Sequence, residues 1–211
     1  MERLSRMFYA VADGLPGLAI DPFKAIVAPR PIAWISTIDA AGRLNLAPYS
    51  YFNAVCAAPP MVMFSSDGWK DTVAACAETR EFVVNLASYE LRDAVNESSA
   101  PLPRGSSEFD HVGLTPCPSR LVRPPRVGEA PASLECRVTE ILTPKTADGR
   151  VTANHVVFGE VVGVHIRDDC LVDGRFDMVR AGTIGRCGYS DFVHVDELFR
   201  MARPKGGGNG A

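Results

Sequence analysis

The sequence has few of the residues that build metal sites. Its 211 residues include six cysteines and four histidines, and no two cysteines stand in a CxxC or CxxxxC pair. Structural zinc and iron–sulfur sites need such pairs to bring thiolates to one metal, so we expect no metal site. The apolar stretch at residues 7–12 is too short for an export signal, and Asp13 ends it. We therefore expect free thiols in a reducing cytoplasm.

An excess of charge of one sign is also lacking. The chain has 22 Lys and Arg against 25 Asp and Glu, which gives a formal net charge of −3. Nucleic-acid binders need a basic face, so we expect no nucleic-acid partner. No apolar run approaches the roughly 18 residues of a membrane span, so we expect no membrane contact. A hydrophobic content of 46% over this length predicts one domain that binds a small molecule or another protein.

Several common catalytic motifs are absent. The sequence has no GxGxxG after a predicted strand and no GxxxxGK[ST], HExxH or GxSxG. These absences argue against dinucleotide-binding folds, P-loop enzymes, zincins and α/β-hydrolases.

Short β-rich runs separated by turns make up most of the chain. Strands are predicted at 32–37, from 44 onwards, and at 51–56, 61–65, 82–86, 134–143 and 156–166. Helices are predicted at 72–79 and at 88–97, the second with Ser88 as N-cap. Many short strands with few helices predict a closed β-barrel rather than a βαβ sheet. We place a single domain at 1–202 and a disordered Gly-rich tail at 203–211.

The segment 98–130 is rich in proline and glycine but keeps apolar side chains. A loop of this length usually forms an interface or a lid. We predict that it contributes to a homodimer interface, because a barrel this small has limited surface of its own to offer. The alternative is that the segment folds over one open end of its own barrel.

Two stretches mix polar and aromatic or charged residues in ways that suit a ligand. Residues 45–53, NLAPYSYFN, offer flat apolar groups with a few polar ones, as a planar heteroaromatic ligand requires. A barrel strand with inward aromatic side chains explains that pattern equally well. In 65–72, SSDGWKDT, a strand and a turn deliver Lys70, Asp71 and Thr72 to a helix start, where an anion is attracted. The alternative is that Asp71 is an ordinary N-cap and Lys70 lies in solvent.

Together these blocks resemble the flavin reductase-like family of FMN-binding split β-barrel proteins. The matching blocks lie at 28–37, 39–53, 59–64, 70–72, 82–85, 96–101, 108–109, 113–119, 124–126, 134–136 and 159–161. The resemblance spans about residue 21 to about residue 189. Several separate blocks in the right order make it far more specific than any single block.

The resemblance implies a mainly β protein with a few helices, built as a six-stranded Greek-key split barrel. It also implies a homodimer with a flavin near the subunit interface. The implied function is an FMN-binding oxidoreductase, an NAD(P)H:flavin reductase that passes hydride to flavin N5, in some relatives as the reductase half of a two-component monooxygenase. The alternatives are a flavoredoxin-like FMN electron carrier that receives electrons from a protein and, more distantly, a flavin-binding module without turnover.

The resemblance also assigns cofactor-binding residues. The isoalloxazine ring and ribityl chain are assigned to Ser36, Thr37, Asn45, Ala47, Pro48, Tyr49, Ser50 and Asn53, and the phosphate to Lys70, Asp71 and Thr72. One apparent phosphate clamp favours FMN over FAD. Backbone N–H groups with Ser50 and Asn53 can stabilise the reduced ring, so no catalytic acid, base or nucleophile is expected.

One departure from the family concerns the nicotinamide. Relatives that act on free flavin often carry Gly-Asp-His near the carboxyl end, whereas this chain has GRCGYSD at 185–191. Arg186 and Tyr189 are the candidates to replace that histidine. We expect the chain's own histidines to be structural or exposed, because none sits in a matched block with a partner. They are His111, His155, His165 and His194.

Overall fold

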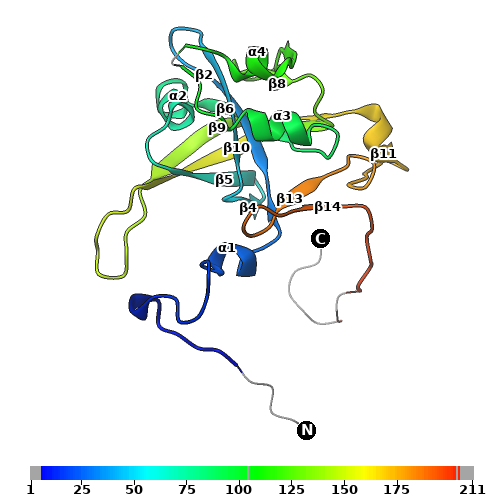
Figure 1. Ribbon diagram of the computed structural model, residues 1–211. Coiled ribbons are helices and arrows are strands. Elements are labelled where there is room, and N and C mark those ends of the chain that lie inside the picture. Colours follow the sequence, from blue (N-terminus) through cyan, green and yellow to red (C-terminus); the bar gives the residue numbers. More distant parts are fainter. Residues whose placement is uncertain (1–5, 104, 203, 205–211) are drawn as a thin grey trace.

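The computed structural model describes residues 6–103, 105–202 and 204 (Figure 1). The predicted Gly-rich tail lies outside these residues, apart from Pro204. Among the helices that are described, none has both the length and the apolar character needed to cross a membrane. Strands outnumber helices, as the sequence predicts.

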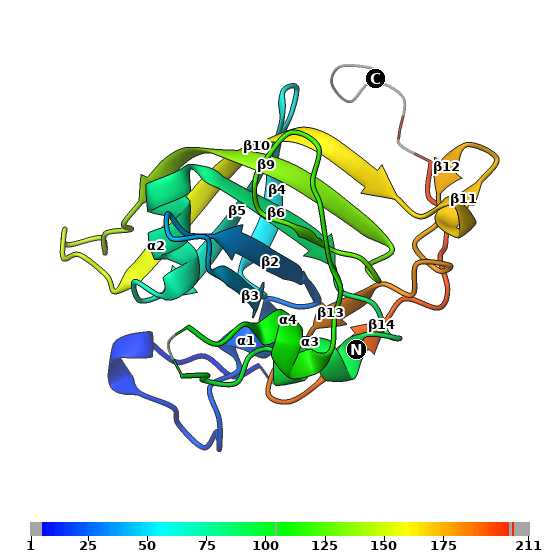
Figure 2. The ribbon, with the colours of Figure 1, turned by 90° about the horizontal axis from the view of Figure 1, so that it is seen from above.

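Seven strands form one antiparallel sheet in the order β3-β2-β6-β9-β10-β5-β4. They are β2 Ala33–Ile38, β3 Leu44–Tyr49, β4 Phe52–Ala57, β5 Pro60–Asp67, β6 Glu81–Leu86, β9 Ala132–Leu142 and β10 Asn154–Ile166. The sheet curls until β3 also contacts β5 (Figure 2). All the predicted strands form, but a count of six is not confirmed, because seven strands are hydrogen-bonded together.

Shorter elements surround this sheet. Helices are α1 Phe23–Ile26, α2 Asp71–Thr79, α3 Arg92–Glu97 and α4 Glu108–Val112, with 3₁₀ turns at Val11–Asp13 and Asp168–Cys170. A three-stranded sheet joins β1 Arg30–Pro31, β13 Ile184–Arg186 and β14 Phe192–His194. Two-stranded ribbons join β7 Pro116–Cys117 with β8 Arg126–Val127, and β11 Leu171–Val172 with β12 Arg175–Phe176.

Strand β2 is buried on both faces and contributes to two apolar clusters. Because side chains alternate along a strand, Ile35 points to the barrel interior and Trp34 to the opposite face. The interior cluster contains Phe64 and Phe82, whose rings meet edge to face at 5.4 Å between centroids. Full burial of each such ring stabilises the fold by about 1.5–3 kcal/mol.

Helix α2 lies at one end of the curled sheet (Figure 2) and contacts strands β2, β3, β6, β9 and β10. Its buried Val73 and Cys76 belong to the interior cluster, so the helix is held by the core rather than by its own propensity. The helix predicted at 72–79 is therefore confirmed with one extra residue at its start. Burial also raises the pKa of the Cys76 thiol.

The second predicted helix begins later than expected. Helix α3 starts at Arg92, with Leu91 as its N-cap. Ser88 instead forms a β-bridge with Thr183, which ties the chain after β6 to the carboxyl-terminal segment. The predicted N-cap at Ser88 is wrong, because tertiary pairing engages that residue before the helix begins.

The segment 98–130 packs over the outer face of β2. Phe109 and Val127 are fully buried in the cluster around Trp34, and the Trp34 Nε1 donates to the Ser98 hydroxyl at 2.9 Å. Of the segment's large apolar side chains, Leu121 is exposed. Most of the segment's apolar residues therefore pack on their own domain, as the alternative expected, but against the outer face of β2 and not over an open end of the barrel.

Candidate functional site

The first group of predicted site residues meets at the amino end of α2. Strands β2 and β3 place Thr37 opposite Asn45. The Asn45 Nδ2 donates to the Thr72 hydroxyl at 2.9 Å, and Thr72, in the first turn of α2, is buried. This hydrogen bond fixes the start of the helix against strand β3.

Tyr49 lies inside the barrel and interacts with the same helix start at Thr72. Its ring lies 4.8 Å from that of Phe64, and only 8% of the residue is exposed. Burial raises the pKa of Tyr49 above its ordinary value, and hydrogen bonds with Thr72 and Ser66 act in the opposite direction. Tyr49 is therefore a neutral phenol that braces Thr72, and its buried position keeps it from the surface.

The amino end of α2 lacks a side-chain cap. Lys70 is the N-cap in extended conformation, and its side chain makes no capping hydrogen bond. The first N–H groups of any helix lack partners within it, and the helix dipole adds positive potential there. Lys70 is exposed beside them. An ammonium and uncapped N–H groups together fit the single phosphate of FMN.

Asp71 is the first residue of α2. Its side chain lines a small pocket of about 90 Å³ together with Asp39, Glu78 and Glu108. These carboxylates make that pocket acidic, so it does not suit a phosphate.

The second group lies at the turn after β3. Pro48 and Ser50 line a pocket of about 380 Å³ whose other walls include Arg30, Arg186, Tyr189 and Phe192. The segment that stands in place of the family's Gly-Asp-His thus borders the predicted flavin residues Pro48 and Ser50. A pocket of this size lies within the range that holds small organic ligands.

Arg30 holds the walls of this pocket together. Its guanidinium donates to the backbone carbonyls of Val27 and, at 2.9 Å, of Cys187. The residue is 7% exposed, and its buried Nε has no hydrogen-bond partner among the described residues. The Arg186 guanidinium lies 4.3 Å over the ring of Phe192, which fixes a cation at the pocket wall.

The structure does not bring the Ser36 side chain to either group. Ser36 is fully buried on the opposite face of β2 from Thr37, where its hydroxyl donates to the Pro125 carbonyl at 2.5 Å. The same hydroxyl accepts from the Asn85 side chain at 3.1 Å. Thr37 is fully buried as well, and its hydroxyl has no partner among the described residues.

The remaining predicted residues are less enclosed. Ala47 is half-buried on β3, and Asn53 is exposed on β4, where its side chain accepts from the Ala54 N–H at 2.8 Å. Both residues therefore keep some accessible surface on the barrel.

Sequence reasoning missed Asn85, which organises the structure behind the site. Its amide donates to the Trp34 carbonyl at 3.0 Å and accepts from the Val127 N–H at 2.8 Å and the Ser133 hydroxyl at 2.9 Å. One side chain thereby links β2, β6, β8 and β9. The available signal was an amide in the middle of the apolar run EFVVNL, because a buried amide must find several partners.

Comparison with known proteins gives the family. A profile described as the flavin reductase like domain matches residues 27–179. An uncharacterized protein of Halalkalibacterium halodurans is 36% identical over 183 residues, which cover 84% of this chain and 87% of that protein.

Two solved structures are similar over most of the chain. Nitrilotriacetate monooxygenase component B from Bacillus cereus is 29% identical with a TM-score of 0.80, covering 89% of this chain and 100% of that chain. Flavoredoxin of Desulfovibrio vulgaris shares the fold, with a TM-score of 0.76 at 21% identity over 95% of this chain and 100% of that chain. The mainly β split-barrel fold that the sequence predicts is therefore confirmed. The chain belongs to the flavin reductase like family and is a flavin-related oxidoreductase.

Proposed function

We propose that the protein is an FMN-dependent NAD(P)H oxidoreductase that carries the flavin phosphate at the amino end of α2. The observation that supports this most is the uncapped first turn of α2, which begins at Lys70 and is held in place by the Asn45 to Thr72 hydrogen bond. One such anion site and no dinucleotide glycine motif favour FMN over FAD.

When bound, FMN supplies the two-electron chemistry that polypeptide side chains lack. The chain's own contribution is to bind and orient. We place the ring beside the pocket lined by Pro48 and Ser50, where the Ser50 hydroxyl and the exposed Asn53 amide are available to its polar edge. Ser36, whose hydroxyl is bonded to Pro125, is left out of the proposed contacts.

The same pocket suits a nicotinamide donor. Arg186 gives it a fixed cation near the proposed flavin position, and Tyr189 adds an aromatic wall. A guanidinium pairs well with the phosphate groups of a dinucleotide. We therefore assign to Arg186 the positioning of the donor that a histidine provides in relatives.

A flavoredoxin-like electron carrier is the second candidate. The observation that favours it is the segment 185–191, which contains no histidine. A carrier needs an exposed flavin edge but no binding site for a nicotinamide.

Anaerobic stopped-flow mixing of the FMN-loaded protein with NADH and with NADPH separates the two candidates. We expect rapid bleaching of the flavin band with at least one of them. Arg186→Ala is expected to slow this reaction while leaving reduction by dithionite unchanged, and Arg175→Ala, an exposed arginine on β12, is the matched control. An unchanged spectrum with both nicotinamides would contradict the reductase and support the carrier.

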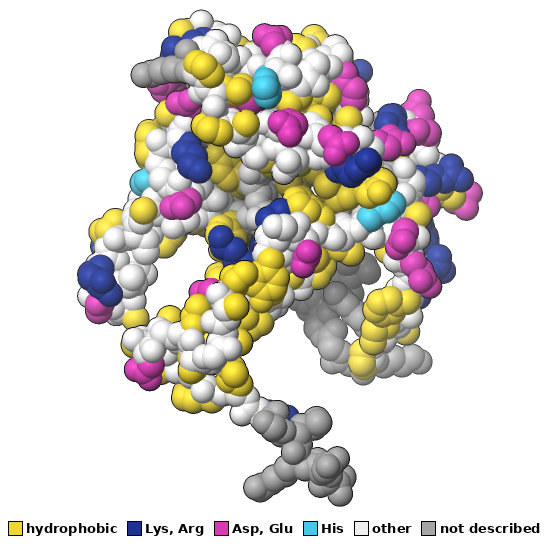
Figure 3. All heavy atoms as spheres, viewed as in Figure 1, with side chains coloured by type: hydrophobic (Ala, Val, Ile, Leu, Met, Phe, Trp, Pro, Cys, Tyr) yellow, Lys and Arg dark blue, Asp and Glu magenta, His cyan; other side chains and the backbone are white. Residues whose placement is uncertain are grey.

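We also propose a homodimer, and the exposed apolar surface supports it. Figure 3 shows the chain segment near the amino end leaving the body with hydrophobic side chains in view. Phe8 is 90% exposed and Phe199, near the other end, 85%. Strand β4 exposes its apolar residues as well, with Val55 at 48%, beside an apolar groove of about 460 Å³. Soluble monomers rarely leave so much apolar surface uncovered.

Similarity to a monooxygenase component supports a monooxygenase as a further partner and electron acceptor.

The six cysteines are all free, and three of them are buried. Free thiols are typical of a reducing compartment, so we place the protein in the cytoplasm.

A further inference from the structure

A second pocket lies between the loop 120–126 and the ends of β9 and β10. Its volume is about 440 Å³, and it shares no lining residue with the pocket at Pro48 and Ser50. Its walls include Arg120, Arg126, His165 and Arg167. Neither the proposed flavin site nor the proposed donor site uses any of these residues.

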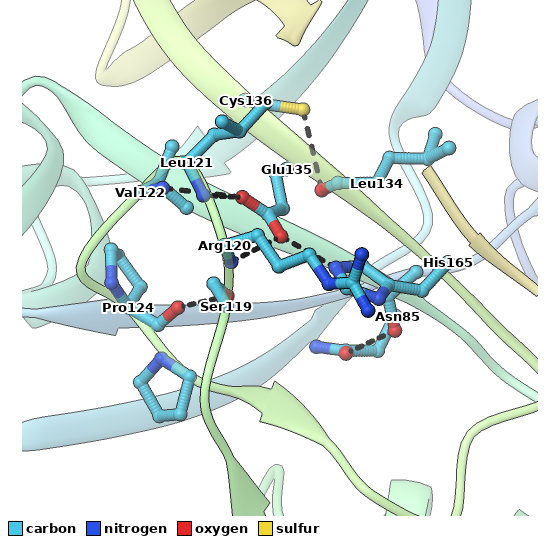
Figure 4. A network of polar contacts seen from close by, with 12 residues as sticks. Asn85, Ser119, Arg120, Leu121, Val122, Pro124, Leu134, Glu135, Cys136 and His165 are labelled. Atoms are coloured by element: carbon cyan, nitrogen blue, oxygen red, sulfur yellow. Dashed lines mark hydrogen bonds and ion pairs between the residues drawn. The ribbon is translucent and has the colours of Figure 1, made fainter. Parts of the chain in front are cut away.

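The floor of this pocket is the carboxylate of Glu135, shown in Figure 4. One oxygen accepts from the Arg120 N–H at 2.8 Å and lies 2.5 Å from the His165 Nε2. The other accepts from the N–H groups of Leu121 at 2.6 Å and Val122 at 3.2 Å. Both oxygens are therefore occupied, and the loop is anchored through its backbone, which leaves the Arg120 side chain free to face the pocket.

Glu135 remains a carboxylate in this buried place. Burial by itself raises its pKa, but the hydrogen bonds from Arg120, His165 and Leu121 outweigh burial and hold the pKa below its ordinary value. An ionised Glu135 keeps the loop fixed, so the arginines above it are held at defined positions.

The cations outnumber their partners. Arg167 pairs with Asp169 at 2.7 Å, but within the described ranges Arg120 and Arg126 form no ion pair. The Nε of Arg126 is buried and has no hydrogen-bond partner among the described residues. Among the described residues no acceptor takes up the guanidinium donors of Arg126, so the group retains hydrogen-bonding capacity.

The position of Arg126 is set by its neighbour. Arg126 belongs to β8 and pairs with Cys117, and the next residue, Val127, donates its N–H to the Asn85 side chain at 2.8 Å. The guanidinium is thus presented from rigid backbone rather than from a mobile loop.

Small and apolar residues also line part of the pocket. Ala132, Val164 and Ile166 border it, but along β9 and β10 they alternate with Ser133, Glu135 and His165, so their side chains point to the other face of the sheet. The apolar walls on the Glu135 side are therefore Leu121, Ala130 and Pro131. An inorganic ion would leave these walls bare to water, whereas an organic molecule with one charged end would cover them.

We propose that this pocket binds a small organic anion, with its oxyanion held by Arg120 and Arg126 and its apolar body against Leu121, Ala130 and Pro131. Guanidinium groups bind both carboxylates and phosphates through paired hydrogen bonds, so either group satisfies the site. The pocket shares no lining residue with the pocket proposed for the flavin ring and the donor, so this proposal stands whether or not the proposed reductase activity does.

Calorimetric titration of the FMN-loaded protein with benzoate and with phenyl phosphate tests the proposal and distinguishes the two anions. We expect saturable binding of at least one, and none of benzamide, which has the same shape without charge. Arg126→Gln and Arg120→Gln should each weaken binding by about tenfold or more, since a hydrogen bond to a charged group contributes about 1.5–3 kcal/mol. Arg123→Gln is the matched control, because Arg123 lies in the same loop but pairs with Glu81 outside the pocket.

Three results would overturn the proposal: binding of neither anion, equal binding by Arg126→Gln and Arg123→Gln, or displacement of the anion by excess FMN. If Arg126→Gln fails to fold, as judged by its urea unfolding curve, Arg120→Gln decides the matter, because that side chain is exposed. Failure of the reductase proposal is recognised separately, by an FMN-loaded protein that binds the anion but does not react with a nicotinamide.

Discussion

The Asn45 side chain donates a hydrogen bond of 2.9 Å to the Thr72 hydroxyl and so joins strand β3 to the first turn of α2. Two sequence blocks separated by the whole β4–β5 hairpin meet at this contact. No side chain caps that first turn, and Lys70 lies exposed beside it. A helix start that is held in place by a neighbouring strand and lacks a side-chain cap is suited to an anion.

Ser36→Ala tests whether the buried hydroxyl is structural. The change removes one donor to Pro125 and one acceptor for Asn85, so we expect the free energy of unfolding in urea to fall by about 1–3 kcal/mol. We expect the FMN dissociation constant of the folded variant to stay within about twofold of the wild type, because a factor of two is less than 0.5 kcal/mol. A tenfold loss of FMN affinity without loss of stability would return Ser36 to the flavin site.

Glu135→Gln tests the buried carboxylate through pH. Because its pKa in the folded protein lies below the ordinary value of 4.5, its contribution to stability is present above that pH and is lost as the pH falls through the folded value. We expect urea unfolding of the wild type to show a steeper loss of stability than Glu135→Gln between about pH 5 and about pH 3. Glu140→Gln, at an exposed position of β9, is the control. Parallel pH profiles for Glu135→Gln and wild type would contradict the assignment.

Val55→Asp tests the homodimer. A carboxylate on the exposed apolar strand β4 adds an uncompensated charge to the proposed interface. We therefore expect the dissociation constant of the dimer to rise by tenfold or more, which corresponds to about 1.4 kcal/mol. Sedimentation velocity across a dilution series measures this shift. Val151→Asp is the matched control, because Val151 is 65% exposed in the turn between β9 and β10, away from β4. A monomeric wild type at all concentrations would rule out the dimer.

The strands and helix α2 were predictable from the sequence because local patterns decide them. Apolar alternation sets the strands, and the turn SSDGW sets the start of α2. Ser88 was not predictable in this way, since its partner Thr183 lies 95 positions away, from 88 to 183. The same holds for the carboxyl-terminal strands, because β13 pairs with the distant β1 and β14 pairs with β13.

The predicted site residues fall into separate groups, some of them buried, and this too depends on long-range structure that the local sequence does not show. Resemblance identifies residues along a strand, but alternation sends Ser36 and Thr37 to opposite faces, and only the folded sheet shows that both side chains are buried. Arg30 lies in a matched block, yet its bond to Cys187 spans 157 positions and has no local signature. The Glu135 and His165 contact likewise joins two strands 30 positions apart.

Titration of the purified protein with FMN, followed by quenching of flavin fluorescence, tests the central claim that the amino end of α2 binds the flavin phosphate. The matched variants are Lys70→Ala, which removes the exposed cation at that helix start, and Lys145→Ala, which removes an exposed cation in the β9–β10 turn. We predict that Lys70→Ala weakens FMN binding by about ten- to a hundredfold, equal to about 1.5–3 kcal/mol, that Lys145→Ala leaves it unchanged, and that FAD binds less tightly than FMN. Equal FMN affinity in the wild type and both variants would contradict the claim.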